Sequence, residues 1–169
     1  MKTKLHQFNK DIRALLASFL IVLSIGVGIG LYYIYYTTAM GAEGTELRYA
    51  GEIPPNNYDP EIDFLEKPAK ETEELLSLTH NHIITFAFIF LLTALIFEKN
   101  TVINGRWKLF LIIEPFISTI ITFSGFFIIQ YFRGFSYIII ISSTLMYLSF
   151  YVMALVSIYQ LIFMKNERK

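Results

Sequence analysis

The chain has 169 residues, of which 54% are hydrophobic and 17% aromatic, and its formal net charge is zero. Such a composition is too apolar for one soluble domain and indicates a protein that folds in lipid. The sequence contains no cysteine. This excludes disulfides, thiolate metal sites and covalent c-type haem attachment.

Four uncharged or nearly uncharged runs follow one another along the chain, and each is long enough to cross a bilayer. A hydrocarbon core of about 30 Å needs about 20 residues of α-helix, at roughly 1.5 Å per residue. The expected spans are residues 14–36, 75–97, 109–132 and 137–164. Because these runs are solidly apolar and lack strand-like alternation, the sequence predicts an all-α membrane protein. Its expected architecture is an up-down bundle of four transmembrane helices with one long acidic outer loop.

Basic residues gather on one side of the four spans. Ten of the fourteen lysines and arginines precede the first span, follow the last one or separate the second from the third. The positive-inside rule therefore places both tails, residues 1–13 and 165–169, and the loop 98–108 in the cytoplasm. Residues 37–74 and the short turn 133–136 are expected on the outer side.

The segment between the first two spans is long and acidic. Residues 37–78 carry ten acidic and three basic side chains, a net charge of minus seven. The middle of the segment, residues 53–60, is rich in turn residues and is not expected to be helical. A helix is expected from about residue 69 to residue 97, with Pro68 suited to its first turn. The acidic excess indicates either a solvated face or a docking surface for a basic partner or cations.

Two histidines, His80 and His82, stand in the outermost turn of the second span or just above it. Residues two apart on an α-helix point roughly 200° away from each other, so the two rings cannot grip one metal from a regular helix. We expect His80 to face inward, because its face continues through the small residues Ala87 and Ala94, and His82 to lie nearer the interface or the loop. One interpretation of the pair is hydrogen bonding to loop carbonyls or acidic residues.

A bound cofactor is the other interpretation, because four-helix bundles can hold one between facing helices. Bis-histidine haem needs ligands from two helices at one depth, whereas the remaining histidine, His6, lies on the opposite side of the membrane. No cofactor is therefore predicted from this chain alone. A haem or metal shared with a partner, or held together with a carboxylate such as Glu73, stays open as the alternative.

One carboxyl lies well inside a span. Glu114, followed by Pro115, is roughly 9 Å along the helix from the cytoplasmic interface, and an intramembrane carboxyl is a functional hypothesis by default, here for proton or ion movement. Residues at similar depth complete a candidate intramembrane polar layer, namely Ser18, Thr93, Ser157 and Tyr159. The alternative is a neutral or snorkelling side chain beside a proline kink. The histidines belong to the other half of the membrane, so the two groups are separate sites.

Three stretches carry a resemblance to known proteins. Leu75-Leu76-Ser77-Leu78-Thr79-His80-Asn81-His82 enters a span, Lys108 leads to Glu114-Pro115-Phe116, and Gln130-Tyr131-Phe132-Arg133 marks an outer exit. Over residues 70–165 the chain resembles a group of uncharacterised four-helix bacterial inner-membrane proteins. The resemblance implies a bacterial origin and a histidine pair in the outer leaflet of the inner membrane. It implies no particular reaction.

The sequence contains no nucleophile constellation, phosphate loop, nucleotide fingerprint or metalloprotease motif, so an enzyme is not predicted. The preferred hypothesis is a non-enzymatic subunit or scaffold of a larger membrane complex, docked through the acidic outer loop. The alternative is an electron-transfer component in which His80 or His82 helps to hold haem, metal or quinone near the outer face. The expected partners are the lipid bilayer and either another membrane protein or a second copy of the chain, with no nucleic acid.

Overall fold

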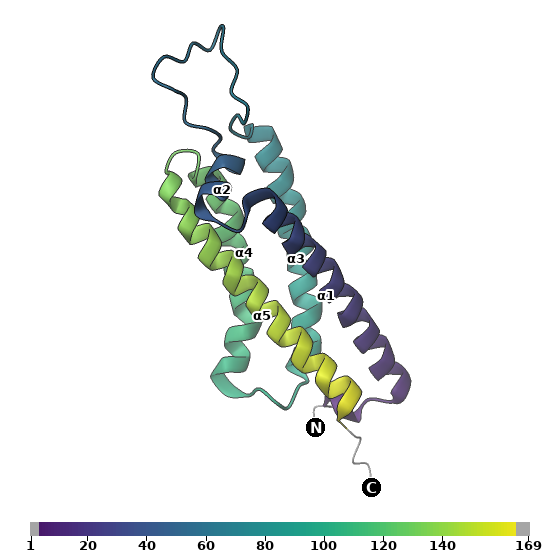
Figure 1. Ribbon diagram of the computed structural model, residues 1–169. Helices are drawn as coiled ribbons and strands as arrows, with labels where there is room; N and C mark the ends of the chain where they lie inside the picture. The colour runs from purple at the N-terminus through teal and green to yellow at the C-terminus, as the bar shows by residue number, and fades with distance from the viewer. Residues whose placement is uncertain (1–3, 165–169) are drawn as a thin grey trace.

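Four long helices build the molecule, which is known from a computed structural model that describes residues 4–164 (Figure 1). They are α1 (Lys10–Thr38), α3 (Thr72–Glu98), α4 (Gly105–Ile128) and α5 (Ser136–Phe163). The shorter elements are the α-helix α2 (Ala42–Tyr49) and the 3-10 helices η1 (Leu5–Gln7) and η2 (Arg133–Phe135). Residues 4–164 contain no strand.

The predicted fold class is confirmed by this architecture. Four helices are long and apolar enough to cross a membrane, and they run up and down along the bundle (Figure 1). Helices suit this setting because the bilayer interior offers no hydrogen-bond partner to an exposed backbone. The chain is therefore a multi-pass membrane protein. Below, the end where α1 begins and α5 stops is called the termini end, and the opposite end is called the α2 end.

Side-chain and backbone signals determine where α1 begins and ends. Asn9 caps its start, because its side chain accepts a hydrogen bond from the backbone N–H of Ile12. At the other end Ala39 and Met40 adopt left-handed backbone conformations, with φ of 50° and 54°. Such a conformation costs an L-residue about 1–2 kcal/mol. It turns the chain back, so that α2 lies across the end of the bundle (Figure 1).

Helix α5 is the centre of the packing. It contacts α1, α3 and α4, and its contact with α4 is the most extensive in the described part of the chain. Across that contact the hydroxyls of Thr122 and Ser142 are 2.8 Å apart, and the Tyr151 hydroxyl donates to the Ser24 carbonyl of α1 at 3.1 Å. Polar contacts of this kind join transmembrane helices where lipid supplies no hydrophobic driving force. By contrast, α1 and α3 touch at few points.

The segment between α2 and α3 leaves the bundle and returns at a narrow neck (Figure 1). The backbone N–H of Glu52 donates to the Lys67 carbonyl at 2.9 Å, and that of Lys70 donates to the Tyr49 carbonyl at 3.2 Å. Gly51 lies between these bonds with φ of 72°, and a Cβ there would stand 2.3 Å from the backbone nitrogen of Ala69. We call the pairing of residues 49–52 with residues 67–70 the neck.

The neck corrects the expected start of the second spanning helix. Helix α3 begins at Thr72 rather than near residue 69, so Pro68 lies outside it. The backbones of Lys67 and Lys70 are bonded to residues at and just after the end of α2, which keeps the intervening chain out of the helix. Helix α2 is a second difference from expectation, because its eight residues fall in a segment expected to be a loop.

Candidate functional site

Because α1 parts from α3, a cavity opens at the α2 end. Its volume is about 620 Å³, and its walls come from α1, α3, α4 and α5, with α2 as its roof. A groove of about 600 Å³ between α1 and α3 continues it toward the termini end. Both spaces are lined by Gly30, Phe86 and Tyr147, so they form one elongated site. We call its two parts the roofed cavity and the lateral groove.

Two glycines make room along α1. A Cβ added to Gly26 or Gly30 would have nothing within 4 Å, and the two residues are four apart, on one face of the helix. A Gly-x-x-x-Gly pair is a common contact face between transmembrane helices. Within residues 4–164 no helix packs closely against this face, which lines the lateral groove instead.

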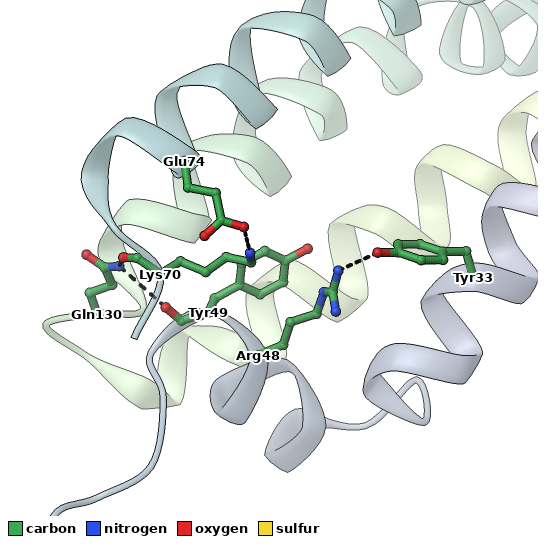
Figure 2. Close-up of polar contacts among 6 residues, drawn as sticks. All are labelled: Tyr33, Arg48, Tyr49, Lys70, Glu74 and Gln130. Atoms are coloured by element: carbon green, nitrogen blue, oxygen red, sulfur yellow. Dashed lines mark hydrogen bonds and ion pairs between the residues drawn. The ribbon is translucent and has the colours of Figure 1, made fainter. Parts of the chain in front are cut away.

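The roof carries an arginine between two tyrosines (Figure 2). Nη2 of Arg48 donates to the Tyr33 hydroxyl at 2.8 Å. The guanidinium carbon lies 5.3 Å from the Tyr33 ring centroid and 6.0 Å from the Tyr49 ring centroid. Tyr49 stacks on Phe126 of α4, with centroids 4.0 Å apart. Burial raises the pKa of the Tyr49 phenol above its ordinary value of 10.0, although the Arg48 charge acts in the opposite direction.

Polar contacts fasten α2 and the neck to the other helices. The Gln130 side-chain amide donates to the Lys70 carbonyl at 2.6 Å and to the Tyr49 carbonyl at 3.4 Å (Figure 2). Lys70 also forms an ion pair with Glu74 of α3 (Figure 2). The position of Arg48 therefore depends on contacts from several helices and not on α2 alone.

Sequence reasoning missed the residues of this roof. Arg48 and Tyr49 lie in the outer segment, which the sequence analysis treats as a loop with a net charge. A weak signal was available: residues 42–49 contain no proline, and Thr45 and Tyr49, four residues apart, provide one face. Thr45 is indeed buried, and it lines the roofed cavity together with Tyr49.

The two histidines have different surroundings, and the expectation that His80 faces inward is wrong. The His82 ring centroid lies 5.3 Å from that of Phe123 on α4 and the side chain lines the roofed cavity, although the residue is exposed. His80 is exposed as well, but it lies on another side of α3 and does not line the cavity. The helical period explains this result, because His82 lies four residues before the buried Phe86. Nδ1 of His82 donates to the Leu78 carbonyl at 2.8 Å, which leaves Nε2 for a ligand.

The histidines do not assemble a metal or haem site by themselves. They lie two apart on α3, and His6 belongs to η1 at the termini end. Within residues 4–164, no group of three or more histidine, aspartate or glutamate side chains is arranged so that it could hold a metal ion. A haem or metal that His80 or His82 shares with a partner therefore stays a prediction.

Only three residues of the predicted polar layer are buried. Glu114, Thr93 and Ser157 are buried in α4, α3 and α5. Ser18 and Tyr159 are exposed on the surfaces of α1 and α5. Tyr159 points outward because it is two residues from Ser157, about 200° around the helix. Ser18 lines the lateral groove instead of joining the layer.

The buried members of the layer have incomplete hydrogen bonding. One carboxyl oxygen of Glu114 accepts a hydrogen bond from Ser118. Its second oxygen and the hydroxyls of Thr93 and Ser157 are buried without a hydrogen-bond partner among residues 4–164. None of the three residues lines the roofed cavity or the lateral groove. They lie apart from this site, and a role in proton or ion movement stays a prediction.

A comparison with protein families finds a match over most of the chain. The Aq_1264_TM family, described as a transmembrane helical domain, matches residues 39–168. The match begins where α1 ends, and it covers the roof and the three other spanning helices. It supports the resemblance to membrane proteins, whereas the Thr-His-x-His entry to α3 is not shown to be a family feature. No curated protein and no solved structure matches the chain.

Proposed function

The chain belongs to this transmembrane helical domain family, and we propose that it is a non-enzymatic membrane protein that binds an amphipathic molecule of the bilayer. The polar end of the molecule lies under α2 in the roofed cavity, and its hydrocarbon part lies in the lateral groove. The observation that supports this proposal is the shape of the site, which extends between α1 and α3 and is covered by α2 at one end.

The lining residues support an amphipathic ligand. At the α2 end the site is bordered by the polar side chains of Arg48, Tyr33 and His82. The lateral groove is lined mainly by aliphatic and aromatic side chains, among them Val22 and Ile89. Ligand pockets typically measure about 300–1,000 Å³ and combine apolar walls with a few polar groups that orient the ligand. The volume and the distribution of polarity both fit that pattern.

Filling the groove tests this proposal. Gly26→Leu and Gly30→Leu add a side chain where a Cβ meets no atom, and they replace a helical glycine by a residue that favours the helix by roughly 0.8 kcal/mol. We expect both variants to fold as stably as the wild type and to lose the lipid-like molecules that co-purify with it. Mass spectrometry of the purified protein measures this loss. Ala14→Leu, at an exposed position of α1, is the matched control, and unchanged ligand content in both glycine variants would refute the proposal.

We further propose that the α2 end faces the outside of a bacterial inner membrane and that the termini end is cytoplasmic. Arg13, Arg106 and Lys108 lie toward the termini end, and the positive-inside rule favours the cytoplasm for such residues. The chain has no cysteine, so single cysteines can serve as labels. Asn57→Cys should react with an impermeant maleimide in intact cells, whereas Asn104→Cys should react only after the membrane is opened. The reverse pattern would contradict this orientation.

A second candidate function is the scaffold subunit, and the outer loop favours it. Residues 53–66 stand away from the bundle (Figure 1), and the side chains of Ile62 and Phe64 are 73% and 93% exposed. Large apolar side chains exposed together can mark a contact with another protein. We expect the double variant Ile62→Ser, Phe64→Ser to lose a membrane protein that co-purifies stoichiometrically from native membranes. A wild-type preparation that contains no such protein would count against the scaffold.

The electron-transfer alternative uses the same cavity, with a quinone as the amphipathic ligand. His82 borders the cavity and has Nε2 available, so it is the histidine expected to contact the quinone ring. Reduced-minus-oxidised optical spectra of the purified protein test this alternative. A redox signal that is lost in His82→Ala and kept in His80→Ala would support it. A wild-type protein that gives no redox signal with added quinone would argue against it.

A further inference from the structure

Arg48 is a cation that has no anionic partner in the described part of the chain. Its side chain is half-buried and borders the roofed cavity. Within residues 4–164 it takes part in no ion pair. Glu46, on the same helix, accepts a hydrogen bond from Ser136. Glu74, on α3, is paired with Lys70, so neither carboxylate is committed to the guanidinium.

The groups that do touch Arg48 are phenols. Nη2 donates to the Tyr33 hydroxyl, and the Tyr33 and Tyr49 rings lie within cation–π range of the guanidinium (Figure 2). These contacts orient the side chain without neutralising its charge. A guanidinium has five N–H donors in a planar fork that matches a phosphate bidentately. One hydrogen bond to a hydroxyl therefore leaves donors for an anion.

The surroundings of Arg48 join this charge to a hydrocarbon site. A charge beside an apolar space is costly without a counter-charge, and the lateral groove runs away from the roof between α1 and α3. Building on the proposed function, we propose that the ligand is a phosphate-bearing amphiphile. Its phosphate is bound by Arg48, and its hydrocarbon chain lies in the lateral groove.

The length of the lateral groove indicates which hydrocarbon chain the ligand carries. Its lining extends along α1 from Gly30 to Leu15, which is about 22 Å at roughly 1.5 Å per residue. The hydrocarbon core of a bilayer is about 30 Å thick, so one leaflet contributes about half of that length. A chain that fills the groove therefore passes the middle of the membrane. A phosphate-bearing lipid can be a glycerophospholipid, whose chains belong to one leaflet, or a polyisoprenyl phosphate, whose chain is longer. A groove that passes the middle of the membrane favours the polyisoprenyl phosphate.

The test compares lipids that differ only in the phosphate. The full chain is placed in micelles of dodecyl maltoside, a detergent without phosphate, that contain equal amounts of undecaprenyl phosphate and undecaprenol, or of phosphatidic acid and diacylglycerol, and is then examined by native mass spectrometry. We expect one retained lipid per chain. We also expect the phosphate-bearing member to be preferred by roughly tenfold, the effect of one charge-assisted contact. Retention should be greater in the polyisoprenyl arm, and the opposite order would overturn the argument from groove length.

Variants separate the phosphate contact from the groove. Arg48→Gln should retain lipid without a preference, and Arg48→Lys, which keeps the charge but not the fork, should retain part of the preference. Arg106→Gln removes the same charge from an exposed position at the termini end and should behave as wild type. The assignment of the phosphate to Arg48 would be overturned if Arg48→Gln kept the preference, or if wild type retained the phosphate-bearing lipid and its phosphate-free counterpart equally. Neither result would contradict binding of the hydrocarbon chain in the lateral groove.

Other outcomes address the ligand class and the proposed function. Wild-type protein that retains none of the four lipids would overturn the proposed function itself. A lipid-free dimer would show that a second copy fills the groove, and it would overturn both proposals. Inorganic phosphate without lipid is expected to raise the melting temperature of wild type and of Arg48→Gln equally. Inorganic phosphate could instead raise the melting temperature of wild type alone, by as much as the lipid phosphate does. That result would show that the hydrocarbon chain of the ligand is not recognised, and it would overturn the assignment of the ligand to lipids.

Discussion

Two arginines at opposite ends of the bundle, Arg13 and Arg48, differ in how fully the chain satisfies their side chains. At the termini end, Arg13 of α1 donates to the Leu161 carbonyl of α5 at 2.8 and 2.5 Å, and to the Met164 carbonyl at 2.7 Å. At the α2 end, Arg48 donates to one tyrosine hydroxyl and borders the roofed cavity. Arg13 satisfies the last carbonyls of α5, whereas Arg48 borders a cavity that the chain does not fill.

Further hydrogen bonds join the helices at the termini end. At the termini end, Nζ of Lys108 donates to the Glu98 and Asn100 carbonyls at 2.6 and 2.9 Å. The Gln160 side chain accepts a hydrogen bond from the Thr101 backbone at 3.0 Å. Cations that meet the last carbonyls of a helix satisfy those groups and complement the helix dipole. Hydrogen bonds to helix-end carbonyls therefore tie the termini end together, whereas α1 and α3 stand apart along the lateral groove and the roofed cavity.

Breaking the closed end should have the largest effect on stability. Arg13→Ala removes the donor from the last carbonyls of α5, and we expect a loss of about 2–4 kcal/mol in the free energy of unfolding, because hydrogen bonds to charged groups contribute about 1.5–3 kcal/mol each. Arg48→Ala should cost less than about 1 kcal/mol, since it removes one bond to an exposed hydroxyl. Chemical denaturation in detergent micelles measures both values. Equal losses would contradict the comparison.

Opening the neck should have the next largest effect. Gly51→Ala combines a left-handed backbone penalty of about 1–2 kcal/mol with a clash, because the new Cβ would lie 2.3 Å from the Ala69 nitrogen. We expect a total loss of about 2–3 kcal/mol and faster proteolysis of the outer loop. Gly105 is the matched control: its φ is 67°, but a Cβ there meets nothing within 4 Å. If Gly51→Ala and Gly105→Ala lower the free energy of unfolding equally, the close packing of Gly51 against Ala69 does not stabilise the neck.

Two threonines should differ in the sign of the effect. The Thr93 hydroxyl is buried with no hydrogen-bond partner among residues 4–164, so Thr93→Val should stabilise the bundle by about 1 kcal/mol. The Thr122 hydroxyl lies 2.8 Å from that of Ser142, so Thr122→Val should destabilise it by about 1 kcal/mol. Unfolding in detergent reports both changes. A destabilised Thr93→Val protein would point to a role for its hydroxyl beyond packing.

The smallest effect at neutral pH is expected for Tyr49→Phe. The variant keeps the stack on Phe126, so its stability should stay within about 0.5 kcal/mol of wild type. Burial raises the pKa of the Tyr49 phenol in the folded state. The contribution of the protonated phenol is present below the ordinary pKa of 10.0 and is lost as the pH rises through the folded value. Wild type should therefore lose stability relative to the variant in alkali, and a constant difference would contradict this burial.

The histidines show where reasoning from sequence stops. Small residues on the His80 face, Ala87 and Ala94, suggest a close helix contact, but only Ala94 is buried and Ala87, nearer His80, is exposed. The buried face of α3 is formed instead by large aromatic residues, Phe86 and Phe90, and His82 continues that face. Periodicity shows which residues share a face, and it cannot choose between two apolar faces when lipid accepts either one.

The sequence by itself determines that the chain spans the membrane with four helices, because runs of this length and apolarity leave the backbone no other way to satisfy its hydrogen bonds in lipid. The tertiary structure alone decides that α1 parts from α3 and that α2 forms a roof. These features depend on contacts between residues far apart in the chain, such as Gln130 with Lys70 and Gly51 with Ala69. No local pattern of hydrophobicity encodes such contacts, because each partner is chosen by packing in three dimensions.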